Sequence, residues 1–169
     1  MGVTVDSFKT SYILTKNELL FLLSSIRDVK PSHAAQYIIN QFLSDSIASQ
    51  DAVEDLVYKK LANKASGKVV LEPVIDLLAR STLTSDSIWV IECDNTPSPV
   101  FILKTEDMYL YVSCYTHISD AWKITPYQTK DALRGETDAL RISLITLIGK
   151  NGTQRKLEAC DQIFEEDGV

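Results

Sequence analysis

The sequence predicts an α+β fold: an N-terminal helical lobe with a winged-helix-like pattern, followed by an antiparallel β-sheet. In the first half, apolar residues recur at helical spacing. In the second half, they gather in short runs rich in β-branched and aromatic residues. The change falls between Thr82 and Ser87. We therefore expect a helical lobe at residues 1–84 and a sheet lobe at residues 85–169, with one shared core as the alternative.

Helix-start signals place the first two helices. Thr15 is followed three residues later by Glu18, the pattern of a capping box. An apolar face follows at helical spacing, formed by Leu19, Leu22, Leu23 and Ile26. Pro31 suits the first turn of a second helix. The expected buried stripe of that helix is Ala35, Ile38, Ile39, Phe42 and Leu43.

The winged-helix-like pattern lies between residues 49 and 81. Acidic residues come early and lysines late in residues 49–64, an order that suits the dipole of a third helix. Ser66 and Gly67 then predict a turn, and "KVVL" predicts a short strand or extended link. Pro73 opens a fourth helix. Helix, turn, short strand and helix is the element order of a winged-helix protein.

The second half predicts antiparallel strands. "SIWVIEC", "VFILK", "DMYLYVSCYTH" and "AWKITP" are four strand-like runs close enough in sequence to pair as hairpins, and "YQTKDALRGETD" is a short helix. A last hairpin turns at "GKNG" and returns as a polar edge strand. The apolar phase slips near Leu144–Ile145, which indicates a β-bulge or a strand covered on both faces.

Aromatic residues mark the candidate partner-binding surface. Tyr109, Tyr111 and Tyr115 alternate with apolar residues on one strand, and Trp122 and Tyr127 follow nearby. Such a row is typical of a sheet face that is partly exposed to solvent, and it is also typical of an interface with another protein. The apolar N-terminal residues pose the same choice between core and adhesive strand: Phe8, Tyr12, Ile13 and Leu14.

Charge argues against nucleic-acid and membrane partners. The 169-residue chain has a net charge of −6 and a pI of about 4.9, and no basic run exceeds two residues. A protein that binds phosphates without sequence preference needs clustered lysine and arginine. We read no signal peptide and no membrane span. The scattered cysteines Cys93, Cys114 and Cys160 suggest buried thiols in the cytoplasm.

The sequence holds no catalytic, cofactor or metal motif. Cys114, His117 and Asp120 lie close together, which would suit a thiol nucleophile with a base. Zinc would need further ligands, and the other cysteines come singly rather than as a C-x-x-C pair. We therefore expect no enzyme, no cofactor and no metal, with a small enzyme built on these three residues as a distant alternative.

Three segments carry a family resemblance. "LTKNELLFLLSSI", then "LVYKKLANKASGKVVLEPVIDLLARSTLTSDSIWVI", then "MYLYVSCYTHISDAWKITPY" span Leu14 to Pro126. In order and hydrophobic pattern they resemble the EspG-type secretion-associated proteins of type VII (ESX) systems, above all their Gram-positive relatives. The resemblance implies a cytosolic, non-enzymatic chaperone or adaptor that binds helical-hairpin substrates of the WXG or LXG kind. It assigns no particular binding residue.

We therefore expect a protein-binding chaperone or adaptor, with a winged-helix transcriptional regulator as the alternative. A regulator would bind duplex DNA in a salt-sensitive way. The candidate recognition helix at residues 49–64 carries too many acidic residues for that role. The corner around Ser66 and Gly67 is therefore expected to be structural or to face a protein.

Overall fold

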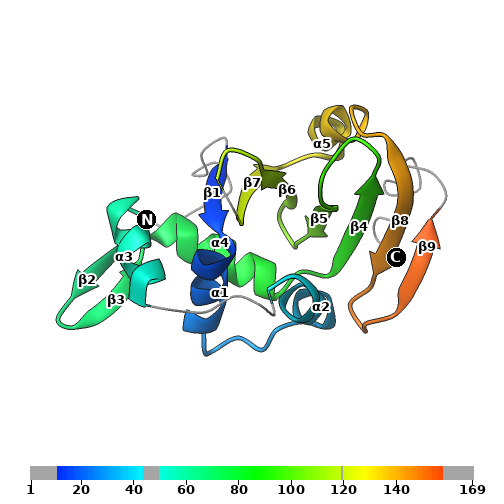
Figure 1. Ribbon diagram of the computed structural model, residues 1–169. Coiled ribbons are helices and arrows are strands. Elements are labelled where there is room, and N and C mark those ends of the chain that lie inside the picture. The colour runs from blue at the N-terminus through cyan, green and yellow to red at the C-terminus, as the bar shows by residue number, and fades with distance from the viewer. Residues whose placement is uncertain (1–10, 44–49, 119, 158–169) are drawn as a thin grey trace.

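Seven strands form one antiparallel sheet in the order β1-β7-β6-β5-β4-β8-β9 (Figure 1). The computed structural model describes residues 11–43, 50–118 and 120–157. The strands are β1 (Tyr12–Thr15), β4 (Ser87–Cys93), β5 (Val100–Lys104), β6 (Tyr109–Tyr115), β7 (Ala121–Tyr127), β8 (Ile142–Ile148) and β9 (Gln154–Leu157). The expected hairpins from β4 to β7 and the β8–β9 hairpin are confirmed, and β9 lies at the sheet edge.

Helices cover both faces of the sheet. The described residues form α1 (Lys16–Ser25), α2 (His33–Phe42), α3 (Gln50–Tyr58), α4 (Pro73–Leu83) and α5 (Lys130–Thr137). A large buried cluster packs the helices α1, α2, α3 and α4 against one face of the sheet, which we call the helical face. A smaller cluster joins Leu133 of α5 to the opposite face, which we call the α5 face. The α+β expectation is confirmed.

Alternation along the strands builds these two clusters. On β4, Ile88 and Val90 belong to the helical-face cluster, whereas Trp89 and Ile91 belong to the α5-face cluster. Successive side chains of a strand point to opposite faces, and both faces are covered here. The central strands therefore read as continuous apolar runs rather than as alternating ones.

A β-bulge shifts the register between β4 and β8. Glu92 pairs with Leu144 and Cys93 pairs with Ile142, so Ser143 is the extra residue. The Ser143 hydroxyl donates to the Glu92 carbonyl at 3.0 Å. The bulge lies one residue before the position that the sequence indicated. Beyond it, β8 is buried on both faces, which was the other interpretation of the same pattern.

Side-chain caps set the starts of α1 and α2. The Thr15 hydroxyl accepts from the Glu18 backbone N–H at 3.1 Å, as the capping box predicted. The Ser32 hydroxyl accepts from the Ala35 N–H at 3.1 Å, so Ser32 is the N-cap of α2. The prediction that Pro31 lies in the first helical turn was wrong, because proline precedes this cap by one residue.

The third helix is shorter than its sequence pattern predicted. It ends at Tyr58, since the N–H groups of Lys60 and Leu61 bond to the carbonyls of Val57 and Leu56. These two bonds form a Schellman motif. Lys60 occupies the left-handed position at φ 63°, where glycine is usual. The predicted helical extension to residue 64 was therefore wrong.

Residues 62–71 instead form a separate two-stranded hairpin, which we call the arm. It consists of β2 (Ala62–Ala65) and β3 (Lys68–Leu71). Ser66 and Gly67 both have positive φ angles, 53° and 77°, which suits a tight hairpin turn. The turn and the "KVVL" strand are confirmed, whereas β2 was missed. The arm projects from one end of the molecule beside α3 (Figure 1).

The N-terminal strand joins the sheet. Tyr12 of β1 pairs with Ile124 of β7, and both Tyr12 and Leu14 are buried. These two residues are core, whereas Phe8 lies outside the described residues. A strand from the expected helical lobe thus forms part of the sheet, and the helical-face cluster contains residues from both halves of the chain.

A buried carboxylate connects the start of α1 to the end of α3. Glu18 is 1% exposed, and its two oxygens accept from the Lys59 ammonium at 2.7 and 2.8 Å. The Thr15 hydroxyl donates to the same carboxylate at 3.1 Å. Lys59 also donates to the Ile13 carbonyl of β1 at 3.3 Å. The charge of Glu18 is therefore paired and hydrogen-bonded, as a buried carboxylate requires.

Lys60→Gly is expected to raise the free energy of unfolding by about 1 kcal/mol, because glycine adopts the left-handed conformation without the Cβ clash. Urea unfolding followed by circular dichroism measures the change. Lys64→Gly, inside β2, is the matched control and should lower stability by roughly 0.5–1 kcal/mol. Equal destabilisation by both substitutions would contradict this reading of the helix end.

Lys59→Met is expected to lower the free energy of unfolding by about 3 kcal/mol, since it leaves the Glu18 carboxylate buried without its cation. Adding Glu18→Gln should recover most of that loss, because the unpaired charge is then gone. Lys30→Met, at an exposed loop lysine, is the control and should change stability little. Additive effects of the two substitutions in a double-mutant cycle would argue against the coupling.

Candidate functional site

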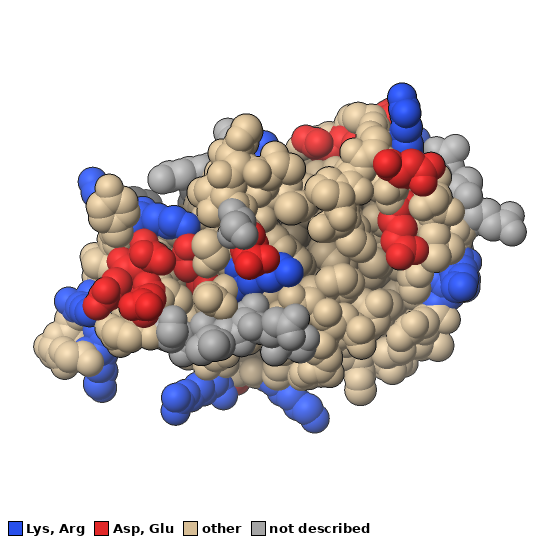
Figure 2. Space-filling view, viewed as in Figure 1, with Lys and Arg blue, Asp and Glu red and all other residues tan. Residues whose placement is uncertain are grey.

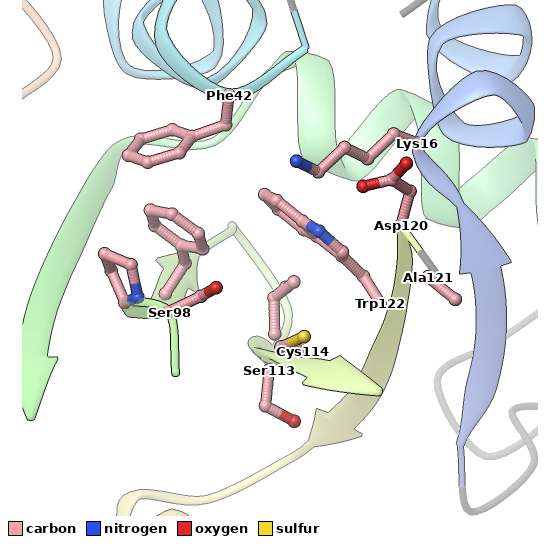
Figure 3. Close-up of a pocket in the computed structure, with 11 residues that line it drawn as sticks. Lys16, Phe42, Ser98, Ser113, Cys114, Asp120, Ala121 and Trp122 are labelled. Carbon is pink, nitrogen blue, oxygen red and sulfur yellow. The ribbon is translucent and has the colours of Figure 1, made fainter. Parts of the chain in front are cut away.

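An aromatic cleft opens on the helical face of the sheet (Figure 3). Trp122 comes from β7, Phe101 from β5 and Phe42 from the last position of α2. The cleft volume is about 140 Å³. Its full lining is Lys16, Phe42, Ser98, Pro99, Phe101, Val112, Ser113, Cys114, Asp120, Ala121 and Trp122.

The three aromatic rings pack against one another. Phe101 and Trp122 are stacked, with ring centroids 5.2 Å apart and an interplanar angle of 15°. The Phe42 ring meets the Phe101 ring edge-on at 4.5 Å between centroids. Sheet pairing explains the stack, since Phe101 pairs with Val112 on β6 and Val112 pairs with Ile124, two residues from Trp122. Offset-stacked and edge-to-face pairs are favourable ring geometries.

Two charged residues border the cleft. The Lys16 ammonium lies 5.9 Å from the Trp122 ring centroid, within range of a cation–π contact. Asp120 has a positive φ of 54°, and its carbonyl accepts from the Lys16 N–H at 2.8 Å. This bond fixes the β6–β7 turn to the start of α1. Figure 3 shows the Lys16 and Asp120 side chains close to each other at the same side of the cleft.

The predicted partner-binding residues do not share one surface. Trp122 is 7% exposed and belongs to the helical face. Tyr109 and Tyr111 belong to the α5 face, and alternation places Tyr115 there too. Tyr111 is 7% exposed, whereas Tyr109 and Tyr115 are half-buried. Their role in partner binding stays a prediction, and Trp122 is separated from the tyrosines by the thickness of the sheet.

The α5 helix closes over the tyrosine side. The Tyr127 hydroxyl donates to the Glu136 carboxylate of α5. Burial, together with this bond and the charge of Glu136, raises the pKa of Tyr127 above its usual value. Burial first, then the charges of Glu136 and Cys93, raises the pKa of Tyr111 to about 12. Both phenols are therefore held in the neutral form beneath α5.

The Cys114, His117 and Asp120 triplet is only partly assembled. Cys114 and Asp120 both line the cleft, whereas the His117 ring packs edge-on against the Tyr115 ring at 5.3 Å. Within residues 11–43, 50–118 and 120–157, no group of three histidine, cysteine, aspartate or glutamate residues is placed to hold a metal ion.

Sequence reasoning missed the contributions of Lys16, Phe42 and Phe101 to the cleft. Phe42 was predicted to be core, and its position at the C-terminal end of α2 leaves its ring at the opening. Phe101 and Trp122 are 21 positions apart in sequence and meet only because β6 lies between their strands. The strand pattern gave the correct faces, but the register that aligns the two rings depends on two turns.

Tyr111→Phe is expected to reduce the loss of stability at high pH. The unfolded phenol titrates near pH 10 and the folded one at about 12. The stabilisation from neutral Tyr111 is therefore fully present below about pH 10 and is lost as the pH rises towards 12. Urea unfolding at several alkaline pH values tests this. A variant whose profile coincides with that of the wild type in this window would contradict it.

Comparison with known proteins places this chain in no family. Neither the protein-family models nor the curated proteins contain a match to this chain. Among the described residues, none of the helices has the length and apolar character needed to cross a bilayer.

Proposed function

We propose that this protein is a cytoplasmic, non-enzymatic chaperone or adaptor that holds helical-hairpin substrates of type VII secretion, of the WXG or LXG kind. The aromatic cleft is the observation that supports the proposal. Its volume of about 140 Å³ is well below the roughly 300–1,000 Å³ of small-molecule sites. The cleft therefore suits one large apolar side chain of a partner protein better than a cofactor.

The chemistry of the cleft fits a binding hot spot. Aromatic rings supply the apolar contact, and Lys16 and Asp120 supply polar groups at the border. Interface hot spots are enriched in aromatic residues that lie in pockets from which water is excluded. A partner helix would place an apolar side chain in the cleft against the Phe42 and Trp122 rings, which meet edge-on with centroids 6.3 Å apart. Its polar side chains would lie near Lys16 and Asp120.

The resemblance to EspG-type proteins supports the same class of partner. The resemblance rests on an order of early helices, a lysine-rich segment, a strand, a further helix and then a sheet. In this chain Lys59 and Lys60 follow α3 directly, and the arm, α4 and the strands from β4 onward come after them. Proteins of that family bind helical hairpins before export. A partner helix in the cleft would be consistent with this mode of action.

A winged-helix transcriptional regulator is the second candidate. The arm follows α3 as a wing would and carries Lys64 and Lys68. The helix before it exposes Asp51, Glu54 and Asp55, which repel phosphates. An electrophoretic shift of duplex DNA at low salt would favour the regulator over the chaperone.

Co-expression with WXG- or LXG-like proteins encoded beside the gene tests the proposal. We expect one of them to co-purify and to remain bound at low micromolar concentration. Ser98→Trp should weaken binding at least about tenfold, because an indole from this exposed border residue fills the cleft. Failure to retain any such protein would contradict the proposal.

Two variants serve as controls for this experiment. Ser98→Ala removes only a hydroxyl and should bind as the wild type does. Thr153→Trp adds the same indole at an exposed turn next to β9, at the opposite end of the sheet from β1 and β7. Equal loss of binding in Thr153→Trp and Ser98→Trp would show that the cleft is not the contact.

A further inference from the structure

The arm is exposed to solvent except at its base, where Ala62 is buried and Leu71 packs against the core. Residues 63–70 are all exposed, and the large apolar side chains Val69 and Val70 are 37% and 51% exposed. Tyr58, at the end of α3 beside it, is 89% exposed. A two-stranded hairpin without a packed face is marginally stable in water. An apolar hairpin presented in this way is therefore suited to gain stability from a partner.

The arm and the helix before it carry opposite charges. Between Tyr58 and Leu71 the chain has four lysines and no acidic residue. Lys59 is bound to Glu18, which leaves Lys60, Lys64 and Lys68 exposed. Just before them, α3 exposes Asp51, Glu54 and Asp55. Figure 2 shows acidic side chains gathered over α3 with lysines beside them at the end where the arm projects.

The acidic residues of α3 and the exposed Tyr58 lie on the same side of that helix. Positions 51, 54, 55 and 58 recur at a spacing of three to four residues, so Asp51, Glu54, Asp55 and Tyr58 lie on one side of α3. The arm begins four residues after Tyr58, and its strand β2 packs against α3.

The register of the arm pairs Lys64 with Val69 and Asn63 with Val70, and successive residues alternate between faces. Lys68 and Val70 therefore share one face of the arm, whereas Lys64 and Val69 share the other. The resulting surface is acidic along α3 and aromatic at Tyr58, and each face of the arm adds one lysine and one exposed valine.

The two parts of this surface have matching lengths. A four-residue strand extends about 13 Å, and the nine-residue α3 is about 13 Å long. If two molecules are related by a two-fold axis, the arm of each lies along α3 of the other. Lys68 of one copy, which lies on the same arm face as Val70, then faces Glu54 and Asp55 of its partner, twice by symmetry.

We propose that this surface is the docking site for a second copy of this chain. The two arms cross between the molecules, and Tyr58 and Val70 are covered in the centre of the contact. Lysines on both arm strands disfavour open-ended strand addition, so a closed pair is expected rather than a fibre. The proposal is independent of the proposed function, because the cleft lies on the sheet and not on the arm.

The oligomeric state of the purified full chain gives the first test. Light scattering and sedimentation velocity over about 1–200 μM should show a concentration-dependent dimer at low salt. Half-molar salt should weaken it at least about tenfold, because the charge pairs are screened. A monomer at all concentrations in low-salt buffer would overturn the proposal. So would a dimer whose affinity is unchanged by salt.

Charge reversal then locates the surface. Lys64→Glu with Lys68→Glu and, separately, Glu54→Lys with Asp55→Lys should each abolish self-association, since like charges then face each other. Mixing the two variants should restore a heterodimer, in which both halves of the contact are again complementary. Lys30→Glu with Lys123→Glu is the control for net charge, and this variant should dimerise as the wild type does.

The same variants separate a second copy from other partners. Suppose that the wild type is a monomer and that the arm-lysine variant no longer binds a WXG- or LXG-like protein that the wild type binds. The arm would then be the contact for that protein, which would overturn the proposal. Heterodimer formation in the mixed variants supports it even where no secretion substrate binds, so its outcome is distinct from that of the cleft. Circular dichroism of each variant establishes that the fold is retained.

Discussion

The buried carboxylate of Glu18 is the constraint on which the layout of this molecule depends. A carboxylate that is 1% exposed must be paired, and its cation comes from Lys59, 41 positions further along the chain. Lys59 is the residue directly after α3, so the pair fixes the end of that helix against β1 and α1. The left-handed turn at Lys60 follows at once and directs the chain into the arm. The ion pair fixes the end of α3, and the Schellman motif directly after it starts the arm.

The same junction also sets the border of the cleft. Thr15 caps α1 and bonds to Glu18, and the next residue, Lys16, donates its backbone N–H to Asp120. That bond holds the β6–β7 turn beside α1, so Trp122 on β7 lies next to the Lys16 ammonium. The strand β1 is only four residues long, yet it pairs with β7, which carries Trp122, and its Ile13 carbonyl accepts from Lys59 next to the arm. A substitution at this junction would therefore alter the structure of both the cleft and the arm.

Local signals predicted most of the fold, and contacts distant in sequence account for what they missed. Alternation and capping predicted the strands from β3 to β9, the start of α1 and the β8–β9 turn, because these depend on neighbouring residues. Residues 59–64 read as helix because their spacing is helical, and only tertiary contacts of Lys59 and the pairing of Ala62 with Leu71 override it. The cleft could not be predicted, since it requires the register of three strands and the end position of Phe42.

In the proposed function, the cleft holds an apolar side chain from another polypeptide. Hydrogen–deuterium exchange of the full chain, with and without a purified WXG-type helical hairpin, tests it most directly. If the partner occupies the cleft, exchange slows in the two turns beside it, residues 94–98 and 116–118, and stays unchanged in α5. Protection confined to the α5 face, or no change in either turn at saturating partner, would contradict it.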